Sequence, residues 1–175
     1  MKEPENINRQ LRIAEKKYKT LAEQIAAITY IADANEAGSV RYVSPQIEQI
    51  LGFSPEEWLA DPELWSKQIH PDDRARVLAE YKSSREKCLP FQSEYRCLTY
   101  DGRILWCYNN AVLVKDDDGK PLFFQGVVSN ITEYKRVTEE IQLFQAVTLA
   151  VSEARDLHDA LVTVNREVTA NINLK

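Results

Sequence analysis

The residues best suited to bind a metal ion or move a proton stand at one helix start and one turn. His70 precedes Pro71, Asp72 and Asp73, and an imidazole beside two carboxylates could coordinate a divalent cation. The same order is typical of a helix N-terminus, where proline fits and carboxylates stabilise the first turn through the helix dipole. We favour this capping interpretation, because no second histidine stands nearby. The acidic run at 116–118 lacks the spacing of a calcium loop and predicts a turn.

The sequence carries no recognisable catalytic motif. It has no glycine-rich phosphate loop, nucleophile elbow or paired metal motif. We therefore expect no enzymatic activity from this chain.

Length and composition predict one globular domain with extensions. The chain has 175 residues, 44% of them hydrophobic, and a formal net charge of -5. An acidic chain offers no basic field to nucleic acid, and no apolar run approaches the roughly eighteen residues of a membrane span. Three cysteines without a CxxC pair predict no disulfide framework. A reducing, cytoplasmic location fits these features.

A narrow apolar stripe follows the N-terminal segment. Its members recur at intervals of four and three residues: Ile7, Leu11, Ala14, Tyr18, Leu21 and Ile25. This spacing predicts an amphipathic helix with a heptad seam. Two interpretations are open: the helix packs on its own domain, or it forms a coiled coil with a second copy. The seam is shorter than the about three to four heptads that would decide between them.

Four helix-start signals lie between residues 43 and 90. They read SPQIEQI from Ser44, SPEEWL from Ser54, DPELW from Asp61 and HPDDRARV from His70. Each places proline at the first helical position after a capping residue, and Glu57 completes a capping box with Ser54. The first three helices must be short, whereas the fourth can run from 71 to about 88.

From residue 91 the apolar period changes to two, which predicts a three-stranded meander with Asp-Gly turns at 101–102 and 118–119. A two-residue second turn pairs Leu113 with Phe124, Ala111 with Gly126 and Asn109 with Val128. For the first turn we expect an odd-length loop that pairs Tyr95 with Asn109 and Cys97 with Cys107. A shift of one residue would bury charged side chains.

The other face of this meander is too apolar to be left in water. It carries Leu98, Trp106, Tyr108, Val112, Phe123 and Val127. We expect the N-terminal helix or a second copy of the chain to cover it.

Residues 21–136 resemble a PAS domain. The resemblance rests on TYIADANEAGSVRYVSPQIEQILGFSPEEWL, WSKQIHPDDRARV, FQSEYRCLTYDGRILW and GVVSNIT, in that order. It implies an α+β fold: a five-stranded antiparallel sheet with short helices on one face around a small pocket, flanked by N- and C-terminal signalling helices. Residues 30–34 and 40–43 would form the first two strands, with Gly38 in their turn. We divide the chain into an N-terminal helix at 1–20, a PAS domain at 21–135 and an exit helix with the start of another module at 136–175.

The resemblance also implies a ligand pocket on the inner face of the sheet. The candidate pocket residues are Tyr81, Tyr95, Cys97, Cys107, Asn109, Phe124 and Val128. Asn109 could orient a ligand or be a core amide bonded to Tyr95. Cys97 and Cys107 could be a redox pair or buried thiols that fill the core.

The cofactor is left unknown. The family binds heme, flavins or small metabolites. We do not expect heme, because His70 beside Pro71 is poorly placed as an axial ligand. We do not expect a flavin adduct either, because the helical half lacks the Asn-Cys-Arg-Phe motif of the light-sensing branch.

A strand is joined directly to a helix in GVVSNITEYKRVTEE, residues 126–140. PAS domains typically end in Asp-Ile-Thr at this point, and this chain has Asn130, Ile131 and Thr132. Asn130 could cap the new helix, with Glu133 as the capping-box partner. We expect this signalling joint, residues 130–133, to couple strand geometry to helix orientation.

The C-terminal segment resembles the start of either of two modules. EARDLHDAL is similar to the phosphoacceptor box of one histidine-kinase family, with His158 as the acceptor. LFQAVTLAVSEA followed by RDLHDAL is similar to the entrance of a GAF domain. We favour GAF, because Asp156 is an N-cap signal that would break a phosphoacceptor helix. In both interpretations the chain ends inside its next module.

The resemblance implies a sensory, relay and dimerisation module of a multidomain bacterial signalling protein. Its parent could be a two-component sensor kinase or a cyclic-dinucleotide enzyme. We expect a homodimer, with no nucleic acid and no membrane in this chain. The pocket could hold a small-molecule ligand, and the sequence leaves open whether it does. The alternative function is a ligand-free dimerisation spacer.

Overall fold

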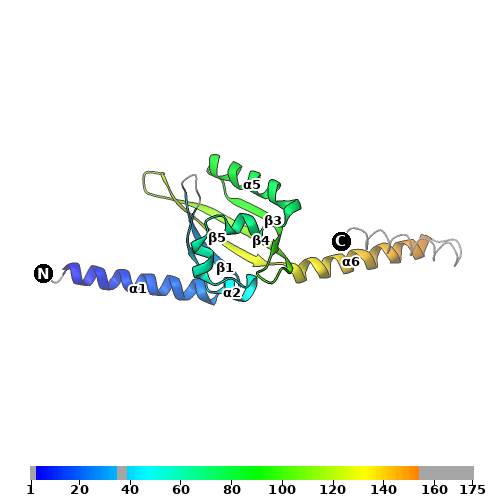
Figure 1. Cartoon of the computed structure of the whole chain (residues 1–175), viewed down its shortest axis with the longest axis horizontal. Helices are drawn as coiled ribbons and strands as arrows, with labels where there is room; N and C mark the ends of the chain where they lie inside the picture. The colour runs from blue at the N-terminus through cyan, green and yellow to red at the C-terminus, as the bar shows by residue number, and fades with distance from the viewer. Residues whose placement is uncertain (1–2, 35–38, 154–175) are drawn as a thin grey trace. The chain divides into compact units, whose positions relative to one another are not determined.

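The computed structural model describes residues 3–34 and 39–153 (Figure 1). Its elements in chain order are α1 (Glu3–Gln24), β1 (Ile28–Asp33), β2 (Val40–Val43), α2 (Gln46–Leu51), α3 (Pro55–Ala60), α4 (Leu64–Gln68), α5 (Pro71–Glu86), β3 (Phe91–Leu98), β4 (Ile104–Lys115), β5 (Pro121–Asn130) and α6 (Thr132–Glu153). The chain divides into two compact units, residues 1–131 and 132–175. Across the described ranges, no helix combines the length and the hydropathy needed to cross a bilayer.

One antiparallel sheet in the order β2-β1-β5-β4-β3 organises the first unit. Its inner face packs against the short helices in a single core, to which α2 contributes Ile47, α3 Trp58 and α5 Val77. This arrangement confirms the predicted α+β class, with five antiparallel strands and short helices on one face. β2 has its predicted bounds and β1 begins two residues earlier than predicted, while Gly38 lies outside the described residues.

The predicted pairing of the last two strands is confirmed. Leu113 pairs with Phe124, and the partners of Ala111 and Asn109 are also as predicted. The turn itself is longer than two residues, because a bulge after Val114 makes Lys115 pair with Pro121. Alternation of apolar residues fixed this register more firmly than the turn did, since a slip would expose a whole buried face.

The predicted pairing of β3 with β4 is wrong by two residues. Tyr95 pairs with Cys107, not Asn109, and Cys97 pairs with Leu105, not Cys107. The loop has an odd length, as expected, but it is closed by the N–H of Thr99 donating to the carbonyl of Arg103, 2.9 Å. An error of two leaves every side chain on its predicted face.

Two of the four predicted caps hold. Ser54 and Glu57 form the capping box, with bonds of 3.1 and 2.8 Å. His70 caps α5 through Nδ1, which accepts the N–H of Asp72 at 3.3 Å. Its capping interpretation is therefore confirmed.

Ser44 and Asp61 do not cap helices, which corrects the prediction. The hydroxyl of Ser44 accepts the N–H of Thr29 in β1, 3.0 Å, so it ties the first strand to the helical layer. Asp61 accepts from the N–H of Glu63 and the Nζ of Lys67, at 3.0 and 2.8 Å, in a turn before α4 begins at Leu64.

The seam of α1 is exposed wherever its side chains are described. Tyr18 is 73% and Leu21 60% exposed, and Ala14 is also exposed. Ile25 lies one residue past the helix and is exposed as well, while the side chains of Ile7 and Leu11 lie outside the description. This exposure argues against the interpretation that the helix buries its stripe on its own domain.

The outer face of the sheet is only partly covered. Val112 is 48% exposed, and the other predicted members of this face are half-buried. Ile104 and Leu122 add exposed apolar surface to β4 and β5.

Candidate ligand pocket

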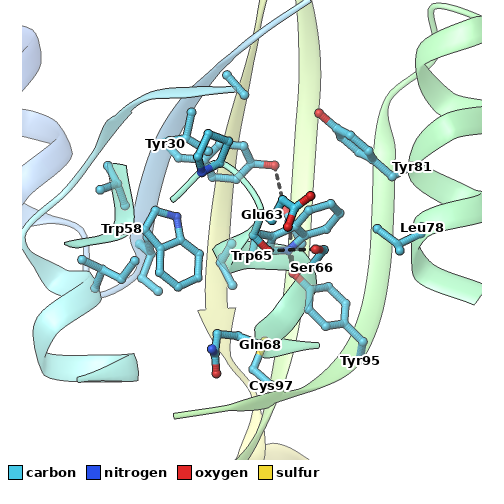
Figure 2. Close-up of a pocket in the computed structure, with 18 of the residues that line it drawn as sticks. Tyr30, Trp58, Glu63, Trp65, Ser66, Gln68, Leu78, Tyr81, Tyr95 and Cys97 are labelled. Carbon is cyan, nitrogen blue, oxygen red and sulfur yellow. Dashed lines mark hydrogen bonds between the residues drawn. The ribbon is translucent and has the colours of Figure 1, made fainter. Parts of the chain in front are cut away.

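A cavity of about 930 Å³ lies between the inner face of the sheet and the short helices (Figure 2). All five strands and helices α2 to α5 contribute to its lining. Ligand-binding cavities in proteins typically measure about 300–1,000 Å³, so this one is large enough for a drug-sized molecule.

Four side chains from separate elements form a polar cluster on the cavity wall. The hydroxyl of Tyr30 donates to Oδ1 of Asn109 at 3.0 Å. Nδ2 of Asn109 and Nε1 of Trp65 both donate to the hydroxyl of Tyr95, at 3.2 and 3.0 Å. Asn109 is thus bonded to Tyr95, as the core-amide interpretation expects, and it also lines the cavity.

Gly126 makes room for Tyr30. The two residues are partners across β1 and β5, and a Cβ at Gly126 would lie 2.4 Å from Cζ of Tyr30. Only glycine allows the phenol ring to lie this close to the neighbouring strand. The position of the Tyr30 hydroxyl therefore depends on a residue with no side chain.

Burial keeps the tyrosines of the pocket protonated. It raises the pKa of Tyr30, Tyr81 and Tyr95 above the usual phenol value, because the interior disfavours the phenolate. The cluster residues Tyr30 and Tyr95 are accordingly O–H donors, and no residue of the cluster carries a formal charge.

Aromatic rings form much of the remaining wall. The rings of Trp65 and Tyr81 meet edge to face with centroids 5.0 Å apart, and Tyr81 meets Phe91 at 5.3 Å. Figure 2 shows Trp58, Trp65, Tyr81 and Tyr95 around one space. The wall is therefore suited to a flat apolar molecule.

Charged lining residues balance in sign. Lys82 and Arg85 are cationic, and Glu63 and Glu86 are anionic. Lys82 and Glu86 form an ion pair at 3.8 Å, and the guanidinium of Arg85 lies 5.6 Å from the centre of the Tyr81 ring.

The structure brings most of the predicted pocket residues together. Tyr81, Tyr95, Cys97, Asn109 and Val128 line the cavity. Cys107 and Phe124 are fully buried core residues that are not part of the lining. Ligand contact by any of these side chains stays a prediction.

Sequence reasoning missed Tyr30, Trp58 and Trp65, which all line the cavity. The tryptophans lie in helices too short to show a period. A signal for Tyr30 was available in Gly126, because an isolated glycine in an apolar strand marks a close approach of another group.

The two buried thiols have the properties of core residues. Both Cys97 and Cys107 are buried. Interaction with the Cys107 thiol, together with burial, raises the pKa of Cys97 well above its usual range. A thiol that resists ionisation is a poor nucleophile and a poor partner for disulfide exchange, which favours the core-filling interpretation over a redox pair.

The predicted signalling joint follows the sheet without a loop. β5 pairs with β4 up to Asn130, opposite Cys107, and α6 begins at Thr132. Between them, the N–H of Ile131 donates to the carbonyl of Trp106, 2.8 Å. In α6, the carboxylate of Glu133 accepts from the guanidinium of Arg136 at 2.7 and 3.0 Å.

An antiparallel sheet of five strands that encloses a ligand-sized cavity under short helices has the architecture of a PAS domain. Residues 40–128 match the family described as PAS fold. The chain belongs to the PAS family.

Two of its relatives are a sensor and a histidine kinase. The chain is 26% identical over 136 residues to the methyl sulfide methyltransferase-associated sensor of Methanosarcina acetivorans, covering 77% of this chain and 14% of that protein. It is 26% identical over 142 residues to the peroxide stress-activated histidine kinase mak1 of Schizosaccharomyces pombe, covering 81% and 8%. The chain therefore spans only a small part of these relatives.

A solved structure of similar fold also comes from a signalling protein. The N-terminal domain of a diguanylate cyclase with a PAS/PAC sensor from Marinobacter aquaeolei superposes with a TM-score of 0.57 at 27% identity, covering 62% of this chain and 98% of that one. These likenesses identify the chain as a PAS domain of the kind found in signalling proteins.

Proposed function

We propose that this chain is the sensory and relay module of a multidomain bacterial signalling protein. A small organic molecule binds in the cavity, and its presence changes the signal that α6 carries to an output domain. The observation that carries this proposal is the cavity of about 930 Å³ with a polar cluster on its wall. A spacer that only holds two chains together makes no use of such a cavity.

Strand β5 provides the route from ligand to output. Val128 lines the cavity, and Gly126 lies beneath the ring of Tyr30. Two residues after Val128 the strand reaches Asn130, where the joint begins. A ligand that moves Tyr30 or Val128 acts on the strand directly before the helix, and it shifts the output only by binding two arrangements with different affinity.

The module works as a homodimer in this proposal. The exposed stripe of α1 supports it, since apolar side chains such as Tyr18 and Leu21 gain free energy when a second copy buries them. The same stripe favours the second candidate function, a dimerisation spacer. The spacer requires no ligand, and this difference separates the two.

The remaining parts of the proposal follow the division into a helix at 1–20, a PAS domain at 21–135 and a further module from 136. We place the start of a GAF domain in the last segment, or else a phosphoacceptor helix with His158, a residue outside the described ranges. The chain itself catalyses no reaction, binds no nucleic acid and works in the cytoplasm. Enzymatic activity belongs to the output domain of the parent.

Replacing Thr132 with proline in a full-length parent tests the relay. Proline is tolerated in the first turn of a helix, but it fixes the backbone at the joint and restricts Ile131. We expect output that no longer responds to the signal, while the chain still binds its ligand. The matched control is Thr138→Ala, further along the same helix. Regulated output from the Thr132→Pro protein would refute the relay.

A further inference from the structure

The polar cluster of Tyr30, Trp65, Tyr95 and Asn109 contains more hydrogen-bond donors than it uses. The two phenols and the indole each supply one polar hydrogen, and the amide supplies two. Three of these five hydrogens are used in the three bonds that join the cluster. Two hydrogens therefore have no acceptor among the described residues.

This count does not depend on how the amide of Asn109 is oriented. As described, the hydroxyl hydrogen of Tyr95 is left over, because Tyr95 accepts two bonds and Tyr30 donates to Oδ1. With the amide reversed, Tyr95 donates to Oδ1 and the hydrogen of Tyr30 is left over instead. In both orientations one phenol hydrogen and one amide hydrogen are spare.

The residues that carry the spare donors belong to the buried wall of the cavity. Tyr95 is 0% and Asn109 is 2% exposed, and all four residues of the cluster line the cavity. A buried donor without an acceptor costs free energy comparable to a lost hydrogen bond. A molecule whose buried edge carries acceptor atoms relieves that cost, and a molecule that presents only donors does not.

Charge and shape narrow the class further. The four residues of the cluster carry no formal charge, so an anionic group placed against them would have no cation in direct contact with it. The rings of Trp65 and Tyr81 offer flat apolar faces beside the cluster.

We propose that the cavity selects a planar organic molecule whose buried edge is uncharged and presents carbonyl oxygens or ring nitrogens, rather than N–H or O–H groups, to the cluster of Tyr30, Tyr95 and Asn109. This inference rests on the proposed ligand-binding function and adds the chemical class of the ligand.

Three naphthalene probes of nearly equal shape test the class. 2-Acetylnaphthalene carries a carbonyl that can only accept, 1-(2-naphthyl)ethanol carries a hydroxyl that both donates and accepts, and 2-ethylnaphthalene carries neither group. Equilibrium dialysis at pH 8 gives the Kd of each for the unaltered chain. Because the ketone and the hydrocarbon differ in hydration, the informative quantity is the ratio of their Kd values and how a substitution changes it.

Asn109→Asp reverses the character of the cluster with almost no change in shape. A carboxylate supplies no hydrogen, and a protonated acid supplies one where the amide supplied two, so the cluster keeps at most one spare donor instead of two. We expect the ratio of ketone Kd to hydrocarbon Kd to rise about tenfold or more, as for a lost buried hydrogen bond. The alcohol should bind more tightly relative to the hydrocarbon. The matched control is Asn110→Asp, which adds the same charge one residue along β4 on the exposed outer face.

A measurement on the unaltered chain covers the case in which Asn109→Asp does not fold. The carbonyl stretch of bound 2-acetylnaphthalene is recorded by difference infrared spectroscopy. A frequency below that in hexane is expected, because the carbonyl accepts a hydrogen bond.

The possible outcomes test the ligand class separately from the proposed ligand-binding function. A hexane-like carbonyl frequency, or a Kd ratio that Asn109→Asp leaves unchanged while all three probes bind, overturns the ligand class and leaves the pocket intact. Failure of all three probes to bind overturns the ligand pocket, and the class with it.

Discussion

Gly126→Ala should destabilise the domain through a clash with one ring. The added Cβ would lie 2.4, 2.5 and 2.6 Å from Cζ, Cε1 and the hydroxyl oxygen of Tyr30. Ordinary contacts between carbon atoms measure about 3.5–4.0 Å. The neighbouring atoms belong to a stiff ring that is hydrogen-bonded to Asn109, so the ring has to move away as a whole.

The expected loss of stability is about 2 kcal/mol. Overpacking of a core costs about 1–3 kcal/mol, and the lost bond between Tyr30 and Asn109 costs about 1 kcal/mol. Replacing glycine by alanine returns about 0.4–1 kcal/mol through the unfolded chain. Urea denaturation followed by tryptophan fluorescence measures the free energy of unfolding, provided that the slope with urea is unchanged.

A double-mutant cycle isolates the cause. In a Tyr30→Leu background the ring is gone, and Gly126→Ala should then be nearly neutral. In a Tyr30→Phe background most of the ring remains, and the cost should persist. An equal loss in the Tyr30→Leu and wild-type backgrounds would show that the glycine is required for some reason other than the ring.

Three further predictions concern the helices. Ser54→Ala removes the bond that the Ser54 hydroxyl accepts from the N–H of Glu57 and should cost about 1 kcal/mol of stability in thermal denaturation. A change no larger than that of a half-buried helical control, Ser83→Ala, would refute the role of the cap. The guanidinium of Arg96, 2.7 Å from the carboxylate of Asp73, lowers the pKa of Asp73 to about 2. The ionised Asp73 therefore stabilises the folded state at pH values above the unfolded-state pKa of about 3.9, and this contribution is lost as pH falls towards 2. Asp73→Asn should therefore be less stable at pH 6 and should lose less between pH 4 and 2, and parallel pH profiles of the two proteins would contradict this coupling. Leu21→Glu places a charge on the exposed seam of α1 and should raise the dimer dissociation constant at least tenfold in sedimentation equilibrium. Lys17→Glu, which introduces glutamate at an exposed residue outside the seam, should not. Equal dimerisation by both variants would show that the seam is not the dimer interface.

The sheet was predictable where alternation alone decides the structure. The pairing of Leu113 with Phe124 follows from the apolar face of two long strands. It was predicted correctly although the turn is longer than expected. The pairing of β3 with β4 was missed because a distant contact helps to place the loop. The N–H of Tyr100 donates to the carbonyl of Leu51, 2.8 Å, and no pattern within the hairpin signals that bond.

The helical layer was predictable only in part. Ser54 has a local partner three residues away, so its cap could be recognised from the sequence. Ser44 resembles it in sequence but bonds to Thr29 on a strand, and competition between local and tertiary partners is decided by the fold.

The residues of the pocket were likewise predictable only in part. Tyr95 and Asn109 follow from strand alternation, whereas Tyr30 and Trp65 reach the cluster from other elements. Their contribution depends on the three-dimensional position of β1 and α4, and the count of spare donors required all four side chains.

The central claim is that the cavity holds a small molecule, and a native mass spectrum of the purified chain tests it most directly. The expected result is a dimer that carries a reproducible added mass of a few hundred daltons, which is lost when the protein is denatured. The control variant is Val128→Trp, whose larger side chain should occupy part of the cavity and reduce the added mass. A dimer without added mass, even after incubation with the three naphthalene probes, would contradict the sensor and favour the spacer.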